Sequence, residues 1–217
     1  MSWKMLLRFY DEGYKLTENP ISIRLATAAD VDAVVKIHLA SFQGFFLTFL
    51  GTSFLREFYA GVCEDQSGIA IVYVDDSISG FVVGTVQPSG FYRRLIQKRW
   101  WKFGIASLLP VIRKPSIVSR LLRAFTLPTE MSATQINTGT LMSLAVMRNC
   151  QGQGIGKQLV SAFLEGSRKR QIEVVNLTTD AIDNEATNEF YSKIGFTCAR
   201  TFATPEGRLM NEYTIVL

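Results

Sequence analysis

The strongest constraint on the fold is a junction at residues 141–157, where a short apolar run meets three glycines. The run at 141–146 is expected to be a strand, and Gly152, Gly154 and Gly156 open a helix directly after it. Such a junction exposes backbone N–H groups at the positive end of a helix dipole, which suits a diphosphate. The sequence therefore predicts a strand, a loop and a helix arranged around an anion site.

The glycine spacing matches neither of the two common nucleotide-binding loops. Gly152-x-Gly154-x-Gly156 lacks the last glycine of the dinucleotide pattern G-x-G-x-x-G. The lysine of the loop is followed by glutamine, so the Gly-Lys-Ser/Thr ending of a P-loop is absent as well. What remains is Gln151-x-x-Gly154-x-Gly156, whose meaning depends on the segment that follows it.

A second motif begins at Asn184 and reads Asn-Glu-Ala-Thr-Asn-Glu-Phe-Tyr-Ser-Lys-Ile-Gly-Phe. Ala186, Phe190 and Ile194 recur every four residues and predict one apolar stripe of a helix. Asn184 and Tyr191 lie two helical turns apart, which predicts that both sit on a second, polar face. The glycine after the stripe supplies the left-handed residue that ends a helix.

Together, the two segments resemble the GNAT N-acetyltransferase superfamily. Gln151-x-x-Gly154-x-Gly156 is similar to the coenzyme A pyrophosphate loop of that family. The second motif follows the family segment Asn-x-x-Ala-x-x-Phe-Tyr-x-x-x-Gly-Phe, with Thr187 in the position of the alanine. An ordinary amphipathic helix with a glycine cap explains the stripe, but not its place one strand after a matching loop. The resemblance covers residues 21–87 and 139–217.

The resemblance implies an α/β (α+β) fold of the GNAT type, with a mixed, mostly antiparallel central sheet of about six or seven strands and about four flanking helices. Strands are expected at 21–25, 70–74, 80–86, 141–147, 174–178, 200–204 and 209–216. Helices are expected from Thr27 to about residue 42, at 51–63, at 154–170 and from Asn184 onward. Residues 1–20 are expected to be an N-terminal extension, and residues 21–217 a single domain with a helical insertion at about 88–138.

The insertion is basic and aromatic. Nine lysines and arginines and no acid lie between residues 91 and 123, in a chain whose net charge is +4. Trp100, Trp101 and other apolar residues alternate with these charges at helical spacing. Three interpretations are open: an interfacial helix that contacts a membrane through residues 91–123, a helical hairpin packed on its own domain with solvated charges, or a basic face that attracts a phosphate-bearing substrate. Nucleic acid is not expected, because no known binding motif accompanies the charge.

By resemblance, acetyl-CoA is the co-substrate. The loop N–H groups would hold the pyrophosphate, the preceding strand would pair with the pantetheine arm, and Asn184 would bond to that arm. The implied coenzyme-binding residues are Leu144, Ala145, Val146, Gln151, Gly152, Gln153, Gly154, Ile155, Gly156, Lys157, Asn184 and Tyr191. No metal is expected, because the three cysteines and the single histidine form no metal-ligand cluster.

Tyr191 is the predicted general acid, which would give its phenolic proton to the departing thiolate. The alternative is that its hydroxyl only orients the sulfur. No motif indicates the general base, and the candidates are His38, Asp180, Asp183 or a chain of water molecules. A single histidine on the apolar stripe of a helix is more often a hydrogen-bonded packing residue than a base.

These patterns predict an acetyl-CoA-dependent N-acetyltransferase that transfers the acetyl group directly to an amine. The aromatic segment at 41–51 and the basic insertion favour an amino sugar or a carrier-linked small molecule as acceptor, and a peptide N-terminus is the alternative. A rival hypothesis is a catalytically silent GNAT-like module that docks on a membrane or a partner through the insertion.

Three widely spaced cysteines, with no signal or transmembrane run, predict a cytoplasmic protein that is peripheral on the membrane if the insertion binds lipid. No oligomeric state is predicted.

Overall fold

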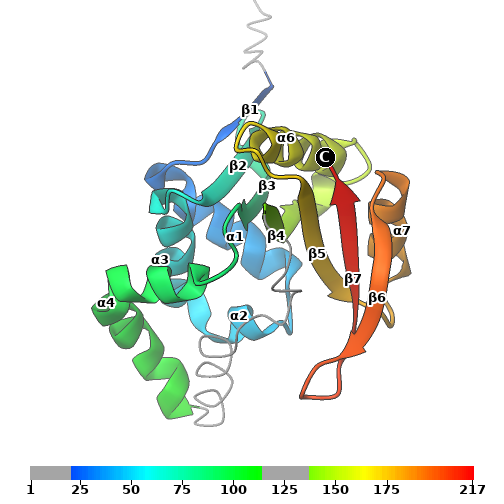
Figure 1. Ribbon diagram of the computed structural model, residues 1–217. Coiled ribbons are helices and arrows are strands. Elements are labelled where there is room, and N and C mark those ends of the chain that lie inside the picture. Colours follow the sequence, from blue (N-terminus) through cyan, green and yellow to red (C-terminus); the bar gives the residue numbers. More distant parts are fainter. Residues whose placement is uncertain (1–20, 114–136) are drawn as a thin grey trace, which may run out of the picture.

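The computed structural model describes residues 21–113 and 137–217, which form a seven-stranded sheet with helices on both faces (Figure 1). The strand order is β1-β2-β3-β4-β5-β7-β6, and every neighbouring pair is antiparallel except β4 and β5. The strands are β1 (Ser22–Leu25), β2 (Gly68–Val74), β3 (Ile78–Thr85), β4 (Thr138–Val146), β5 (Val174–Asp180), β6 (Thr197–Ala203) and β7 (Leu209–Val216). The helices are α1 (Val31–Ser41), α2 (Phe46–Phe49), α3 (Gly51–Glu64), α4 (Phe91–Arg113), α6 (Ile155–Arg168) and α7 (Glu185–Lys193), with 3₁₀ turns η2 (Ala28–Asp30) and η3 (Arg148–Cys150).

The predicted fold class is confirmed, and the elements follow the predicted order with small shifts at their ends. β2 begins at Gly68 rather than at residue 70, and β6 begins at Thr197 rather than at residue 200. The short helix α2 was not predicted. Hydrogen bonds to a neighbouring strand decide where a strand ends, so local sequence marks its middle better than its boundaries. The N-terminal extension lies outside the described residues.

Two apolar clusters lie on opposite faces of the sheet. Alternation along β3 shows the division, because Phe81 and Val83 face the cluster under α1 and α3, whereas Val82 faces the cluster under α6. Leu159 and Phe163 bring the apolar face of α6 onto the second cluster, as their spacing predicted. The first part of the sheet is therefore a buried layer between helices, which fixes the positions of its strands.

The described part of the insertion packs on its own domain. Phe91, Leu95 and Phe103 of α4 are buried in the cluster around α3. Gly61 of α3 permits this approach, because a Cβ there would lie 2.9 Å from Leu95 Cδ1. Trp100 is 69% exposed on the outside of the same helix. Packing on the domain thus holds for the first part of α4, and residues 114–138 of the insertion lie outside the described residues except at their last two positions.

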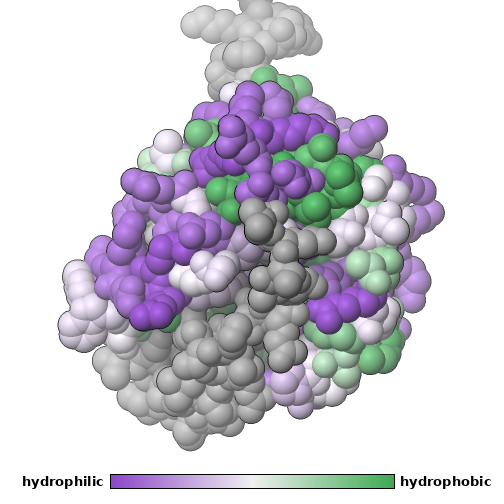
Figure 2. Space-filling view, viewed as in Figure 1, coloured by the Kyte–Doolittle hydropathy of each residue, from purple (hydrophilic) through white to green (hydrophobic). Residues whose placement is uncertain are grey.

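The charges of α4 differ from the expectation of a solvated basic face. Arg99 is buried, and its guanidinium forms ion pairs with Glu57 and Glu64 of α3. Arg94 lies 3.5 Å from Asp65, which follows α3. The acids that neutralise these arginines belong to α3 or directly follow it, so they lie outside the insertion, which carries no acid between residues 91 and 123. Figure 2 shows hydrophilic side chains gathered over α3 and the first part of α4.

Among the described residues, no helix combines the length and the apolar character that are needed to cross a bilayer.

Candidate functional site

The glycine loop presents a row of backbone N–H groups. Gly152 and Gly154 have φ values of 79° and 78°, a left-handed conformation that glycine adopts without strain. A Cβ at either position would meet nothing within 4 Å, so the backbone conformation, not crowding, calls for glycine. No hydrogen bond between described residues uses the N–H groups of residues 152–157. The loop and the first turn of α6 therefore offer unpaired donors at a helix N-terminus.

The strand before the loop separates from its neighbour. β4 and β5 pair only from Thr138 to Thr140 and from Val174 to Asn176, and the two strands diverge beyond that point (Figure 1). The Thr140 hydroxyl donates to Asn176 Oδ1 at 2.7 Å, which closes the fork where pairing stops. The later half of β4 stays paired with β3 on its other side.

The backbone direction of β4 shows which groups face this fork. Met147 N donates to Ser79 O of β3 at 2.8 Å, so the N–H of Val146 points the other way, toward the gap beside β5. The carbonyl of Val146 points the same way and accepts from Gln151 Nε2 at 3.2 Å. Gln151 thus ties the glycine loop to the end of β4. The Val146 N–H faces a gap in which no described strand pairs with it.

Helix α7 begins directly at the end of β5. Asn184 and Asn188 both donate to the carbonyl of Asp180, at 3.3 Å and 3.0 Å. Asn188 Oδ1 also accepts from the Thr179 hydroxyl at 2.6 Å. Asn188 was not among the predicted site residues, although its place four residues after Asn184 was a usable signal. These bonds fix the start of α7 against β5.

Tyr191 corrects the predicted faces of α7. It is 5% exposed and packs edge-on against Phe190 and Phe196, whereas Ala186 of the predicted apolar stripe is exposed. Phe196, which precedes β6, and Tyr213 of β7 pack on the tyrosine ring, so helical spacing alone assigned it to the wrong face. Burial raises the pKa of Tyr191 above its ordinary value. The phenol therefore stays protonated at neutral pH.

Three side chains are candidates for the base: Asp183 is exposed before α7, whereas His38 and Asp180 have partners. His38 is 2% exposed, its Nδ1 lies 2.7 Å from the Tyr59 hydroxyl oxygen, and its Nε2 has no partner among the described residues. Burial lowers the pKa of His38 to about 4. Both carboxylate oxygens of Asp180 accept from the guanidinium of Arg208. Neither His38 nor Asp180 is arranged as a free, solvated base.

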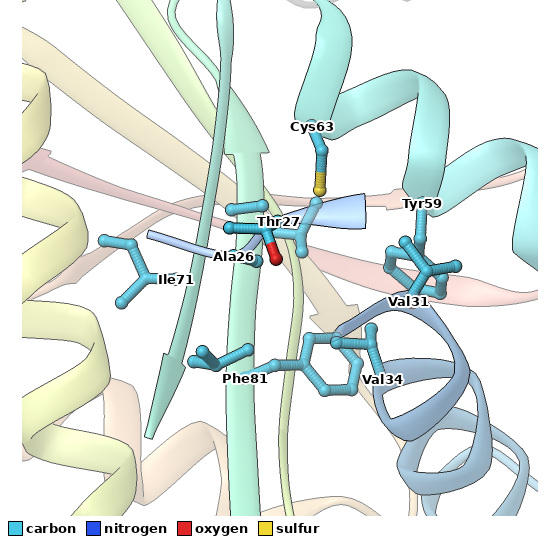
Figure 3. A pocket seen from close by; sticks show the side chains of 11 residues that line it. Ala26, Thr27, Val31, Val34, Tyr59, Cys63, Ile71 and Phe81 are labelled. Atoms are coloured by element: carbon cyan, nitrogen blue, oxygen red, sulfur yellow. The ribbon is translucent and has the colours of Figure 1, made fainter. Parts of the chain in front are cut away.

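A small apolar cavity lies away from this site, among α1, α3, β2 and β3 (Figure 3). Its lining includes Val34, Tyr59 and Phe81, and its volume is about 10 Å³. That volume is at the lower limit for one water, and the lining offers it few polar partners. The cavity is a packing defect of the core and not a ligand site. Among the described residues, no group of three or more histidine, cysteine and acidic side chains could hold a metal ion.

Comparison with known proteins agrees with this geometry. The model of the acetyltransferase (GNAT) family matches residues 120–196. Over 58 residues the chain is 36% identical to N-alpha-acetyltransferase 30 of Schizosaccharomyces pombe, a match that covers 27% of this chain and 38% of that protein. The chain therefore matches less than half the length of this relative.

Solved structures show the same fold at low sequence identity. The ribosomal-protein-alanine N-acetyltransferase of Brucella melitensis has a TM-score of 0.61 at 16% identity, over 90% of this chain and 99% of that one. The ribosomal-protein-S18-alanine N-acetyltransferase of Escherichia coli has a TM-score of 0.57 at 15% identity, over 91% and 94%. The PaiA N-acetyltransferase of Thermoplasma acidophilum, in complex with coenzyme A, has a TM-score of 0.54 at 13% identity, over 89% and 98%.

Proposed function

Because the chain belongs to the GNAT acetyltransferase superfamily, we propose that it transfers the acetyl group of acetyl-CoA directly to an amine. The observation that carries this proposal is the fork between β4 and β5, with the unpaired N–H groups of residues 152–157 at its end. A diphosphate fits such a row of donors. An extended amide-bearing arm fits beside a strand edge, where main-chain groups bond to it as a further strand would.

The coenzyme A arm would lie along residues 144–146 of β4, with its pyrophosphate on the glycine loop and Lys157 adding positive charge. Asn184, at the start of α7, would bond to the pantetheine. The Val146 N–H would donate to the acetyl oxygen as negative charge develops on it. A donor of this kind typically contributes ~3 kcal/mol to stabilisation of the transition state.

The chemical step needs a neutral amine and a proton for the leaving sulfur. The amine nitrogen attacks the acetyl carbon, the carbon–sulfur bond breaks, and the thiolate takes a proton from the phenol of Tyr191. The amine loses one proton to water, and the Tyr191 phenolate regains one proton from water, so no net proton is gained or lost. Burial keeps Tyr191 protonated until charge develops on the sulfur beside it.

The first test is thiol release from acetyl-CoA with a panel of amines. Tyr191→Phe keeps the buried ring and removes only the hydroxyl. If Tyr191 is the general acid, kcat falls about a hundredfold while affinity for acetyl-CoA is unchanged. An unchanged kcat would remove the acid role. A wild-type chain that binds coenzyme A but acetylates no amine would instead support the silent binding module.

We further propose two alternative classes of acceptor amine, which can be distinguished by experiment. The basic, aromatic insertion and the segment at 41–51 favour an amino sugar or a carrier-linked small molecule. The match to an N-alpha-acetyltransferase favours a peptide N-terminus. Mass spectrometry of mixed short peptides and amino sugars, incubated with acetyl-CoA and the chain, separates the two. Acetylation confined to α-amino groups of peptides would exclude the sugar class.

A further inference from the structure

A buried polar chain connects α1, α3 and β4. His38 Nδ1 lies 2.7 Å from the Tyr59 hydroxyl oxygen, and the Ser143 side chain approaches the same hydroxyl from β4. Both rings are 2% exposed, and apolar residues such as Val34 and Phe81 surround them. Burying polar groups in an apolar layer costs free energy unless their hydrogen bonds are complete. Here His38 Nε2 has no partner among the described residues, so stabilisation of the core does not explain this polar chain.

A bulge in β4 gives this polar chain its third member. Val83 pairs with Ser143, whereas the next residue of β3, Gly84, pairs with Leu141, so Met142 is an extra residue in the strand. Without it, strict alternation would place Ser143 on the α6 side of the sheet. With the bulge, Ser143 lies on the same face as Val83, the face that α1 and α3 cover.

Ser143 also belongs to the half of β4 that is not paired with β5. Pairing with β5 ends at Thr140, three residues before Ser143, and the N–H that faces the fork belongs to Val146, three residues after it. Ser143 is partly exposed, unlike Tyr59 and His38 behind it. Its hydroxyl is therefore the accessible end of a buried polar chain, at the edge of the fork.

The face of the sheet on which Ser143 lies is the face from which the acceptor would approach. The glycine loop leads into α6, which covers the opposite face from α1 and α3. A coenzyme held by that loop and threaded between β4 and β5 would present its thioester toward the α1 and α3 side. An attacking amine must approach from the side away from the coenzyme, and Ser143 is on that side.

We propose that Ser143 binds the acceptor amine, and that Tyr59 and His38 are positioning residues that hold the Ser143 hydroxyl in place. This inference rests on the proposed acetyl transfer. One N–H of the neutral amine donates to Ser143 Oγ, which turns the nitrogen lone pair toward the acetyl carbon. The Ser143 proton is directed to the Tyr59 oxygen, and the Tyr59 proton to His38 Nδ1. In this direction each hydroxyl both donates and accepts, and Ser143 keeps a lone pair for the substrate.

The polar chain positions the amine and does not remove its proton. Burial lowers the pKa of His38 to about 4, so the imidazole is a weak proton acceptor at neutral pH. Burial also raises the pKa of Tyr59, which keeps its hydroxyl protonated. Protons released by the amine are therefore expected to leave through solvent, as the water-chain alternative for the base requires.

The decisive variants are Ser143→Val and Ser143→Thr, which have nearly the same shape and differ by one hydroxyl. Both side chains are β-branched and suit a strand. We expect Ser143→Val to lower kcat/KM for the amine at least tenfold, with most of the change in KM. Ser143→Thr should restore most of that loss. The dissociation constant of coenzyme A, measured by calorimetry, should stay within about twofold in both variants.

Tyr59→Phe tests the role of the buried members. It should lower kcat/KM for the amine in the wild-type background and add little in the Ser143→Val background, because both changes remove one interaction. Ser79→Ala is the matched control, since it deletes a buried hydroxyl that has no partner among the described residues and should leave kcat/KM unchanged.

The outcomes separate this inference from the proposed reaction. An active wild type with an equally active Ser143→Val variant overturns the role of Ser143 and leaves acetyl transfer standing. Equal losses in Ser143→Val and Ser143→Thr would show a steric effect and also overturn it. A wild-type chain that binds coenzyme A and acetylates no amine overturns the reaction, and the inference with it.

Discussion

At the scale of single residues, Asp30 joins the first strand to the first helix. It is 7% exposed and accepts hydrogen bonds from Arg24 through both carboxylate oxygens, at 2.7 and 2.8 Å. Thr27 donates to the same carboxylate through its N–H and its hydroxyl. The hydrogen bonds from Arg24 hold the pKa of Asp30 well below its usual range. The ionised carboxylate therefore stabilises the fold.

We expect Asp30→Asn to lower the free energy of unfolding by ~1–2 kcal/mol at pH 7. A carboxyl whose pKa is lowered by folding stabilises fully above its unfolded pKa of about 3.9 and loses that contribution as pH falls further. The difference between variant and wild type should thus shrink below about pH 4. Urea unfolding at pH 7 and at pH 3 measures it. An equal difference at both values would contradict the ion-pair explanation.

His38 should affect stability in a separate pH window. Its pKa falls from about 6.5 in the unfolded chain to about 4 in the fold, because burial disfavours the charged ring. The unfolded state therefore binds the proton first, and the free energy of unfolding should decrease as pH falls from 6.5 toward 4. In His38→Phe, denaturant unfolding should show a flatter profile over that interval. A parallel slope in the two proteins would assign the pH dependence to other groups.

Local sequence marked the glycine loop, whose role as a coenzyme site stays a prediction. Gly152 and Gly154 were identified by their spacing between a strand and a helix, and both adopt positive φ in the structure. Asp180 and Asn188 could not be understood in the same way. Their partners, Arg208 for the first and Thr179 for the second, depend on how the β6–β7 hairpin and α7 pack against β5. Sequence spacing does not contain that packing.

At the scale of elements, the contact between α3 and α4 depends on Arg99. The guanidinium pairs with Glu57 and Glu64, and its side chain is 10% exposed. Arg99→Ala removes the stem and leaves both acids without this partner, so we expect a loss of ~2–3 kcal/mol of unfolding free energy. Arg99→Met keeps the stem volume and should cost less. Arg93→Ala, an exposed change with no ion pair in the described residues, is the control and should stay within ~0.5 kcal/mol.

The outer face of α4 bears on the membrane hypothesis for the insertion. Trp100 and Trp101 are 69% and 53% exposed, and the neighbouring Arg93 and Lys98 are exposed too. Tryptophan beside cationic groups suits an anionic lipid surface. We expect the chain to co-sediment with anionic liposomes at low salt, and a Trp100→Ser, Trp101→Ser double variant to remain in solution. If the wild-type chain ignores anionic liposomes, the membrane hypothesis fails.

The sequence predicted the order of the elements better than it predicted which face of each helix is buried. The periodicity of α6 identified its buried face correctly, because the helix covers a regular sheet surface. The periodicity of α7 did not, because Tyr191 is buried against Phe196, which precedes β6, and Tyr213 of β7. The bulge at Met142 gave no local signal, although it decides which side of the sheet Ser143 faces.

At the scale of the whole molecule, the sheet consists of two parts that share a short parallel contact. Strands β1 to β4 form one part and β5 to β7 the other, and they pair only over residues 138–140 and 174–176. A ligand that fills the fork bonds to both parts and to no unfolded state. At a concentration of 100 times its dissociation constant, such a ligand stabilises a fold by about 2.7 kcal/mol, which corresponds to roughly 5–10 °C in Tm for a chain of this size. We therefore expect coenzyme A to raise Tm by that amount in a thermal melt.

A pair of glycine variants decides whether this stabilisation comes from the phosphate loop. Gly154 and Gly207 have nearly equal φ values of 78° and 79°, and a Cβ added at either position would meet no atom within 4 Å. Alanine at either site therefore introduces a similar strain of ~1 kcal/mol, but only Gly154 lies among the donors at the start of α6. Both variants should melt a few degrees lower without ligand, by about the same amount. With coenzyme A, Gly207→Ala should show the full wild-type shift, whereas Gly154→Ala should lose most of it, because its loop N–H groups no longer converge on the pyrophosphate. Equal shifts in both variants would mean that the loop does not hold the coenzyme.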